Sequence, residues 1–382
     1  MTKLSDVFML QMGKTPARAK NAYWNDGSNQ WVSISDLSGF DKYVGTTKET
    51  ITDLAVSESG IKIVPENTVI MSFKLTLGKT AITQKPVYTN EAIMAFIPTG
   101  KYEIDTNYFY HLFSGRDWSK GTNRAVMGVT LNKATLGEIE IDIPPLCEQT
   151  EIAEKLDKVD ALIADRITQL EKLDLLVKSR FIELFGDTVL NPYNWNKEPL
   201  GKVCDVRDGT HDSPKYYDTG YPLVTSKNLS SGDIDFTDCS LICKNDFDKI
   251  NERSKVDFGD ILMPMIGTVG NPVIVKIKND FAIKNVALIK FYNDTRVTNV
   301  YVKALLKSDY FDSEVLGKVR GGTQKFISLG DIRKLEILVP PIDLQNQFAE
   351  FVEQTDKLKF EVKEALNKLE TLKKSLMQQY FG

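Results

Sequence analysis

The chain has 382 residues, of which 42% are hydrophobic, and it carries a formal net charge of −4. Its length predicts two or three domains, and no apolar run approaches the roughly 20 residues that a membrane-spanning helix needs. The first residues lack the apolar segment of a secretory signal, so we expect a cytoplasmic protein that does not bind membranes. The negative charge argues against a chain that binds nucleic acid by basic charge alone.

Cysteine and histidine are sparse. The four cysteines are Cys147, Cys204, Cys239 and Cys243, and the two histidines, His111 and His211, are far apart. One close cysteine pair without a second pair or nearby histidines is a poor zinc signature. We therefore expect reduced structural thiols and no metal site.

Residues 1–143 predict a globular α/β domain. Apolar runs at Thr68–Phe73 and Ala92–Ile97 are typical of strands. The alternation Ile139-Glu-Ile141-Asp-Ile143 predicts a half-buried strand at the end of the domain.

Residues 144–186 predict a long helix of the coiled-coil type. Pro144 and Pro145 suit its first turn and Gly186 suits its end, and neither proline nor glycine lies between. Apolar residues recur at the coiled-coil period of 3.5, and they form a seam that Arg166 and Arg180 interrupt. The seam positions are Leu156, Ile163, Leu170, Leu173 and Val177.

The same order follows once more. Residues 187–339 predict a second α/β domain, with strands at Asp260–Met265, Val286–Phe291 and Leu335–Val339. Residues 340–382 predict a second long helix, with a seam at Val352, Val362, Leu366 and Leu369 that Thr355, Lys359 and Lys373 interrupt. Two seams in one chain pack most simply on each other. The helices should be antiparallel, because the domain between them has to bring the chain back to the end of the first helix. The alternative is that each helix packs only on its own domain.

These similarities amount to an internal repeat. Residues 144–186 align without a gap on residues 340–382, Gly13 aligns with Gly209, and Val64–Gly78 aligns with Val256–Gly270. The expected fold is α/β (α+β), with two globular domains in pseudo-two-fold repeat and two long helices that form an antiparallel coiled coil. The two domains share their framework positions but differ in the residues between them. Such an arrangement suits the recognition of two different targets at a fixed separation.

No catalytic constellation stands out. Asn191-Pro192-Tyr193 only partly matches the Asn-Pro-Pro-aromatic element of amino-methyltransferases and is better explained as a turn. The Gly267–Gly270 loop lacks the Gly-Lys-Ser/Thr ending of a phosphate-binding loop. His211, between Asp208 and Asp212, could suit a metal, but a turn is the simpler interpretation. We expect no enzyme on this chain and no cofactor.

Polar loops that combine glycine with basic or amide side chains are the candidate DNA contacts, because such side chains bind phosphates and base edges. The candidate residues are Lys74, Lys79, Arg124, His211, Lys227, Arg320, Gln324 and Lys325. The alternative is that these are solvated loops without a binding role.

Over its whole length the chain resembles the DNA-specificity (S) subunit of Type I restriction–modification systems. The strand exit Ile139-x-Ile141-x-x-Pro-Pro, the helix ending Lys178-Ser179…Phe185-Gly186 and the run Gly322–Ile327 carry the resemblance. So does Phe185-Gly-Asp187…Asn191-Pro192…Trp195, which leads into Leu200-Gly-x-Val203.

The resemblance implies that residues 1–143 and 187–339 are target-recognition domains, each of which reads one half of a split, asymmetric DNA sequence. The helices would set the spacing and dock two methyltransferase (M) subunits, which bind S-adenosylmethionine. Restriction (R) subunits would complete an ATP-dependent nuclease. The first domain has no close match to Gly322–Ile327, which leaves its contact loop at Gly121–Arg124 unassigned.

Two other functions remain open from the residues. A duplicated coiled-coil scaffold that never touches DNA agrees with the low basicity of the chain. A self-sufficient methyltransferase would need a glycine-rich cofactor loop, which the sequence lacks.

Overall fold

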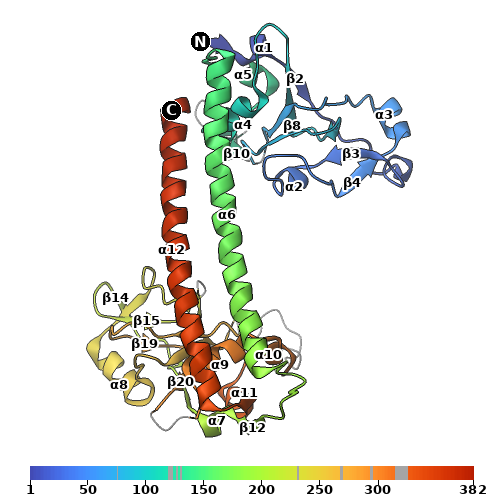
Figure 1. Ribbon diagram of the computed structural model, residues 1–382. Coiled ribbons are helices and arrows are strands. Elements are labelled where there is room, and N and C mark those ends of the chain that lie inside the picture. The colour runs from blue at the N-terminus through green and yellow to red at the C-terminus, as the bar shows by residue number, and fades with distance from the viewer. Residues whose placement is uncertain are drawn as a thin grey trace. The chain divides into compact units, whose positions relative to one another are not determined.

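The computed structural model describes residues 1–74, 76–118, 124–125, 128–129, 131–229, 232–266, 270–292, 296–314 and 326–382. The chain divides into two compact units, of which the first comprises Met1–Ile167 and Glu364–Gly382 and the second Thr168–Lys363. Helix α6 (Leu146–Phe185) begins in the first unit and ends in the second, whereas α12 (Ile342–Phe381) begins in the second and ends in the first (Figure 1).

The first unit is built on a four-stranded antiparallel sheet in the order β2-β8-β5-β6 and a three-stranded sheet in the order β4-β3-β7. In the smaller sheet β3 is antiparallel to β4 and parallel to β7. The strands are β1 (Thr2–Lys3), β2 (Phe8–Met12), β3 (Asn29–Val32), β4 (Glu49–Ile51), β5 (Val69–Ser72), β6 (Thr80–Ile82), β7 (Tyr88–Thr89), β8 (Ile93–Pro98), β9 (Arg124–Ala125), β10 (Gly128–Val129) and β11 (Glu140–Ile141), which pairs with β1. The helices are α1 (Leu4–Val7), η1 (Asn21–Tyr23), α2 (Ile34–Leu37), α3 (Asp53–Ser59), α4 (Thr106–Gly115) and α5 (Lys133–Gly137).

The core of the first unit takes residues from both long helices. Phe109 of α4 packs on Phe8 of the larger sheet, with ring centroids 4.9 Å apart. Leu156 of α6 is fully buried in the same cluster. From the other end of the chain, Phe381 of α12 lies with its ring centroid 5.4 Å from that of Tyr108. The last turn of the chain therefore completes the core that the first domain begins.

The second unit repeats this plan. Its four-stranded sheets have the orders β13-β20-β17-β18 and β14-β16-β15-β19. The strands are β12 (Asn196–Pro199), β13 (Asp205–Asp208), β14 (Tyr216–Tyr217), β15 (Tyr221–Val224), β16 (Ser240–Ile242), β17 (Ile261–Pro264), β18 (Val273–Ile274), β19 (Ala282–Ile283), β20 (Val286–Lys290) and β21 (Glu336–Val339), which pairs with β12. The helices are α7 (Leu200–Val203), η2 (Ser226–Leu229), α8 (Lys244–Ser254), α9 (Asn299–Leu306), α10 (Asp309–Glu314) and α11 (Leu329–Lys334).

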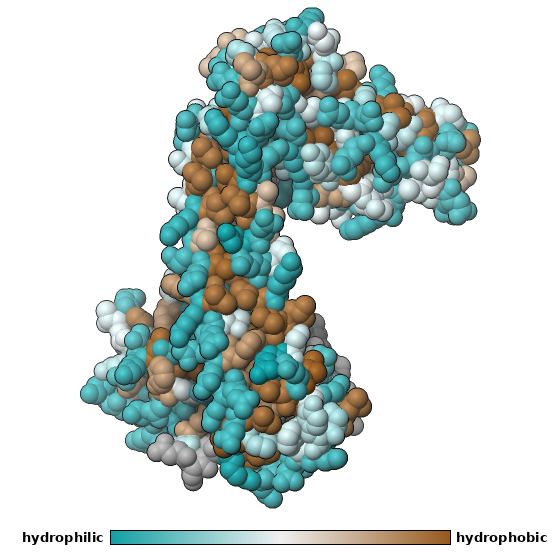
Figure 2. Space-filling view, viewed as in Figure 1, coloured by the Kyte–Doolittle hydropathy of each residue, from teal (hydrophilic) through white to brown (hydrophobic). Residues whose placement is uncertain are grey.

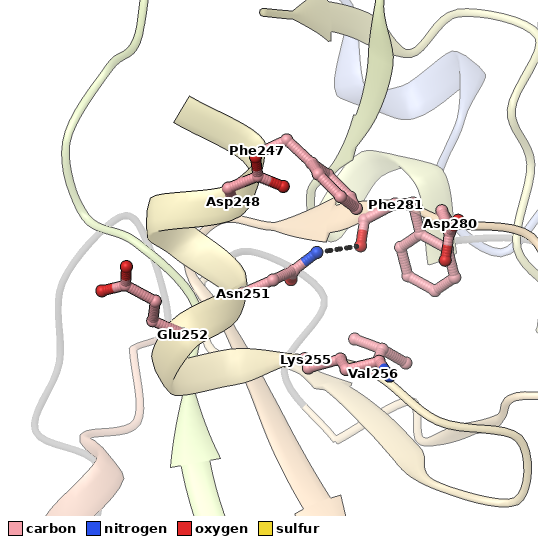
Figure 3. A pocket seen from close by; sticks show the side chains of 8 residues that line it. All are labelled: Phe247, Asp248, Asn251, Glu252, Lys255, Val256, Asp280 and Phe281. Atoms are coloured by element: carbon pink, nitrogen blue, oxygen red, sulfur yellow. Dashed lines mark hydrogen bonds between the residues drawn. The ribbon is translucent and has the colours of Figure 1, made fainter. Parts of the chain in front are cut away.

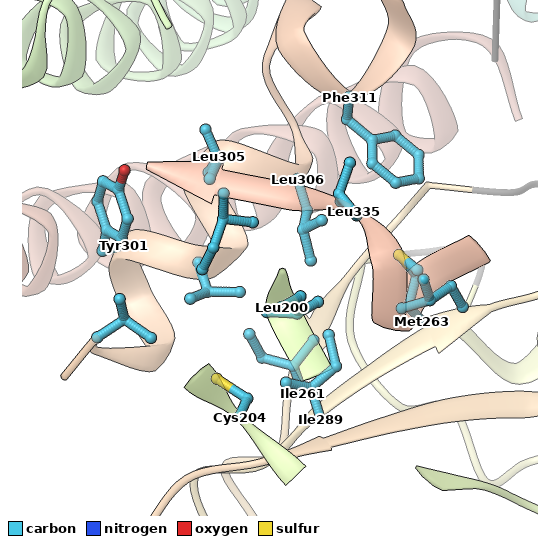
Figure 4. Close-up of a cluster of buried hydrophobic side chains, with 14 of the residues drawn as sticks. Leu200, Cys204, Ile261, Met263, Ile289, Tyr301, Leu305, Leu306, Phe311 and Leu335 are labelled. Atoms are coloured by element: carbon cyan, nitrogen blue, oxygen red, sulfur yellow. The ribbon is translucent and has the colours of Figure 1, made fainter. Parts of the chain in front are cut away.

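Helix α9 covers the sheet β13-β20-β17-β18 in the second unit. Tyr301 and Leu305 of α9 belong to the same buried cluster as Ile261 and Ile289 of the sheet (Figure 4). Phe185 of α6 joins the cluster, with its ring centroid 4.8 Å from that of Tyr301. Phe348 of α12 joins it too.

These observations confirm the predicted fold class and repeat. The predicted strands appear as β5, β8, β11, β17, β20 and β21, each within two residues of its expected ends. The long helices pack both on each other and on the domains, so the two alternatives for their packing are not exclusive. The polar residues that were expected to interrupt the apolar seams are half-buried or buried: Arg166, Arg180, Thr355, Lys359 and Lys373.

Within the described part of the chain, no helix has both the length and the apolar character that crossing a membrane requires.

Candidate nucleic-acid interface

Both units contain the same glycine turn after the first strand of the larger sheet. The N–H of Gly13 donates to the Ile93 carbonyl at 3.1 Å, and that of Gly209 donates to the Val286 carbonyl at 3.0 Å. A Cβ atom at either glycine would lie 2.2 Å from a backbone carbonyl oxygen, which belongs to Thr89 in the first unit and to the equivalent residue of β19 in the second. The close approach of two backbones explains why glycine occupies both positions.

His211 follows the glycine turn of the second unit and is held on both sides of its ring. Its Nδ1 lies 2.8 Å from Oδ1 of Asn285, and its Nε2 lies 2.9 Å from Oδ2 of Asp208. The hydrogen bonds with Asn285 and Asp208 raise the pKa of His211 above its ordinary value. Arg253 donates to the other oxygen of Asp208 at 2.9 Å. This chain of contacts fixes an exposed imidazole in one orientation, and both ring nitrogens are used within the protein rather than for a metal.

Lys227 lies in η2, which follows β15 of the sheet β14-β16-β15-β19. The N–H of Lys284 donates to the carbonyl of Val224, where β15 ends, at 2.9 Å, and Thr210 forms a parallel bridge with Lys284. The side chain of Asn228 closes the turn that begins η2 by accepting from the N–H of Thr225 at 2.9 Å. The segments that carry His211 and Lys227 thus flank one strand, β19.

Lys74 and Lys79 lie together on the loop between β5 and β6 of the first unit. Ser72 fixes this loop, because its backbone carbonyl accepts from the N–H of Gly78 at 3.0 Å and its hydroxyl accepts from the N–H of Lys79 at 3.0 Å. The Lys74 ammonium lies 5.2 Å from the ring centroid of Phe73, while Lys79 is exposed. Two cations on a braced loop suit the binding of phosphates.

The remaining candidates cannot be placed in the same detail. Arg124 lies in β9, of which the backbone is described. Arg320, Gln324 and Lys325 lie outside the described residues, and their role stays a prediction.

The predicted coiled-coil residues lie on the two long helices, α6 and α12. Leu156 is buried, and Ile163, Leu170, Leu173 and Val177 follow it as half-buried positions of α6. On α12, Val362 is buried, and Val352, Leu366 and Leu369 are half-buried. Within the first unit Asp160 of α6 pairs with Lys373 of α12, with the charged atoms 2.5 Å apart. Within the second unit Asp174 pairs with Lys359 at 2.6 Å. Later residues of α6 meet earlier residues of α12, so the helices are antiparallel.

Sequence reasoning missed a buried polar cluster in the first unit. His111 of α4 is almost fully buried, and its Nε2 lies 2.7 Å from Oδ1 of Asp157 on α6. The Lys42 ammonium donates to both oxygens of Asp157, at 2.6 and 2.7 Å. Burial lowers the pKa of His111 despite the opposing effect of Asp157. The cluster joins the domain to its helix, with the imidazole buried and the Asp157 carboxylate partly exposed.

A pocket of about 330 Å³ lies beside α8 in the second unit (Figure 3). Its lining includes the carboxylates of Asp248, Glu252 and Asp280 but the single cation Lys255. An excess of negative charge disfavours phosphate, so this pocket is a poor candidate for contact with nucleic acid.

Comparison with known proteins gives consistent matches along the chain. The family model for the Type I restriction modification DNA specificity domain matches residues 1–172 and 192–373. The chain is 26% identical to the MjaIX specificity subunit of a Type I restriction enzyme from Methanocaldococcus jannaschii, over 92% of this chain and 85% of that protein. It is 23% identical to the MjaVIII specificity subunit from the same organism, over 99% and 90%.

Two solved structures share the fold. One is a Type I restriction-modification S subunit from M. genitalium, with a TM-score of 0.59 and 15% identity over 100% of this chain and 95% of that chain. The other comes from a study of complex assembly and conformational transition in a type I R-M system, with a TM-score of 0.62 and 17% identity over 100% and 96%.

Proposed function

Because this chain belongs to the Type I restriction-modification DNA specificity family, we propose that it selects the DNA target of a restriction–modification complex and catalyses no reaction itself. Residues 1–143 and 187–339 each bind one half of a split, asymmetric target. The helices α6 and α12 hold the two domains at the spacing that the target requires.

One observation carries this proposal: the two units share a backbone frame but differ in the polar side chains mounted on it. The glycine turn is the same at Gly13 and Gly209, and the sheet order β2-β8-β5-β6 matches β13-β20-β17-β18. A duplicated frame with different exposed side chains suits a protein that reads two different base sequences, because base edges are distinguished by their pattern of donors and acceptors.

The helices offer a surface for partner subunits. Apolar side chains gather along them (Figure 2), and the exposed ones in the second unit include Leu175, Ile182, Leu358 and Phe360, of which Phe360 is 65% exposed. Exposed apolar patches of this kind mark interaction sites. We assign this surface to two M subunits, with R subunits joining the complex.

The partners would supply the chemistry and much of the positive charge. A chain of net charge −4 gains little affinity from phosphate contacts alone. S-adenosylmethionine would be bound by the M subunits, which flip the target adenine out of the duplex, and ATP would be bound by the R subunits. This chain would determine where along the DNA the M subunits act.

The proposal is tested by mapping modified adenines in the genome of a host that expresses this chain with its M subunit. We expect one split, asymmetric motif that disappears when this chain is omitted. Exchange of residues 1–143 for those of another family member should change one half of the motif. Methylation that persists without this chain, or that never appears although the two proteins bind each other, would support the scaffold function instead.

A further inference from the structure

A pair of interacting polar side chains occupies the same position in each unit. In the first unit the Thr15 hydroxyl donates to the carboxylate of Glu91. In the second unit Nδ1 of His211 lies 2.8 Å from Oδ1 of Asn285. Each pair crosses from the glycine turn to the connection between β7 and β8 in the first unit, or between β19 and β20 in the second.

The backbone shows that the two pairs are equivalent. The residue after each glycine, Lys14 or Thr210, donates its N–H to the last residue of β7 or β19, at 2.8 and 3.0 Å. The next residue along those strands, Asn90 or Lys284, donates its N–H to the last residue of β3 or β15, at 3.1 and 2.9 Å. Two residues after each glycine stand Thr15 and His211, and two residues after each strand stand Glu91 and Asn285.

The same backbone therefore presents different chemistry in the two units. A carboxylate only accepts hydrogen bonds, and Thr15 is the one hydrogen-bonding partner of Glu91 among the described residues. Asn285 uses its Oδ1 toward His211, which leaves its amide N–H groups as donors. One unit presents an acceptor where the other presents a donor.

Both pairs are accessible and held in place. Glu91 and His211 are exposed, and Asn285 is half-buried. His211 is fixed by Asp208, which Arg253 holds in turn, so the Asn285 amide is oriented before any ligand arrives. A side chain that is already ordered loses little entropy on binding, which favours discrimination between ligands.

We infer that Thr15–Glu91 and His211–Asn285 are equivalent specificity-determining pairs, each of which contacts a base edge in its own half of the DNA target. The inference rests on the proposed function. The Glu91 carboxylate matches the exocyclic amine of cytosine or adenine, and the Asn285 amide matches an acceptor such as O6 or N7 of guanine.

The test uses the assembled complex of this chain with its M subunit and duplexes randomised in both half-sites. Glu91→Gln adds a donor, and Asn285→Asp replaces a donor with an acceptor. We expect each variant to shift the relative base preference by about tenfold at one position of the target. The position that Glu91→Gln changes should lie in one half-site, and the position that Asn285→Asp changes should lie in the other. Thr15→Ser, which keeps the hydroxyl, should retain the original preference. Glu140→Gln, an exposed carboxylate on β11, is the matched control and should change nothing.

Three results would overturn the inference. The first is an unchanged preference at every position for both variants, in a complex whose unaltered form selects a split motif. The second is a change in both half-sites from a single variant. The third is failure of the complex to assemble with either Glu91→Gln or Glu91→Asp, which would assign that position to the fold. If the unaltered complex selects no motif, the proposed function itself fails, and the two failures are thereby distinguished.

Discussion

Gln149 and Gln345 occupy equivalent positions near the starts of the two long helices and make the same hydrogen bonds. The Nε2 of Gln149 donates to the carbonyls of Pro144 at 2.9 Å and Glu103 at 3.0 Å. Its Oε1 accepts from the N–H of Asp105 at 2.9 Å. The side chain thereby connects the strand exit to the residue that caps α4.

Gln345 repeats each contact. It donates to Pro340 at 2.8 Å and to Arg296 at 3.1 Å, and it accepts from the N–H of Thr298, the N-cap of α9, at 2.8 Å. Both glutamines are buried, at 1% and 0% exposure. Each one thereby fixes the first turn of a long helix to its domain.

Replacement of either glutamine with alanine should destabilise the protein. Gln149→Ala leaves a buried N–H and two carbonyls without partners, for which we expect a loss of about 2–4 kcal/mol in the free energy of unfolding. Gln345→Ala should act similarly on the second unit. Urea denaturation measures the loss. The exposed Gln354 is the control, because its replacement should change stability by no more than about 0.5 kcal/mol. Equal effects at all three positions would refute the anchoring role.

The aromatic residues at the ends of the two long helices should matter to different units. Phe185 is fully buried in the second unit, so Phe185→Ala should cost about 3–5 kcal/mol and lower hydrogen-exchange protection within residues 168–363. Phe381 is half-buried against Tyr108, so Phe381→Ala should cost less. Its effect should nevertheless reach strands β2 and β8, near the start of the chain. Exchange changes confined to the last turn of α12 would contradict the shared core.

The two interhelical ion pairs should each contribute modestly to stability. Asp174 is 69% exposed, and water screens its attraction to Lys359, so a double-mutant cycle with Asp174→Ala and Lys359→Ala should give a coupling of about 0.2–1 kcal/mol. The coupling should shrink as salt concentration rises. The cycle for Asp160 and Lys373 should give a similar value. A coupling of zero for both pairs would mean that neither of them contributes to the register of the helices.

Sequence reasoning predicted the fold well because the strongest signals were repeated. The Pro-Pro start, the heptad positions and the glycine end of 144–186 occur again in 340–382, which made chance agreement improbable. It did not assign partners to Lys359 and Lys373, because the carboxylates that pair with them lie on the other helix. Nothing local to Lys359 indicates that Asp174 lies opposite.

The candidate site was only partly predictable. Lys74 and Lys79 could be named as candidates because a loop with glycine and lysine has a local signature. Glu91 and Asn285 were missed because each is a lone polar residue after a short strand, and its significance comes from a backbone bridge to the glycine turn. Alignment of the two halves around Gly13 and Gly209 was the signal that could have found them.

Lengthening both helices together should change the spacing of the target. Insertion of seven residues after Leu170 in α6 and after Lys363 in α12 keeps the heptad phase and adds about 10 Å of helix. We expect the methylated motif to gain about three base pairs between its halves, since base pairs rise by roughly 3.4 Å. Genome-wide mapping of methylation measures this. Insertion of two residues turns the seam to the opposite side of each helix and serves as the control, for which we expect loss of specific methylation.

The two histidines should titrate on opposite sides of the ordinary value of about 6.5. Burial lowers the pKa of His111, and hydrogen bonds with Asn285 and Asp208 raise the pKa of His211. The contribution of His211 to stability is therefore full below its unfolded pKa and is lost as pH rises through its folded pKa. Protonation of His111 opposes folding, so its effect is a loss of stability as pH falls below the unfolded value.

NMR can follow both imidazoles directly, because the sequence has two histidines and each can be assigned by substitution. His211→Asn should remove the titration at higher pH and leave the other unchanged. Asp208→Asn removes the negative charge that favours the charged imidazole, so the pKa of His211 should fall toward its ordinary value. Titration of both rings on the same side of the ordinary value would show that the contacts of His211 do not hold it in solution. The Asn285 amide would then lose the orientation that His211 gives it.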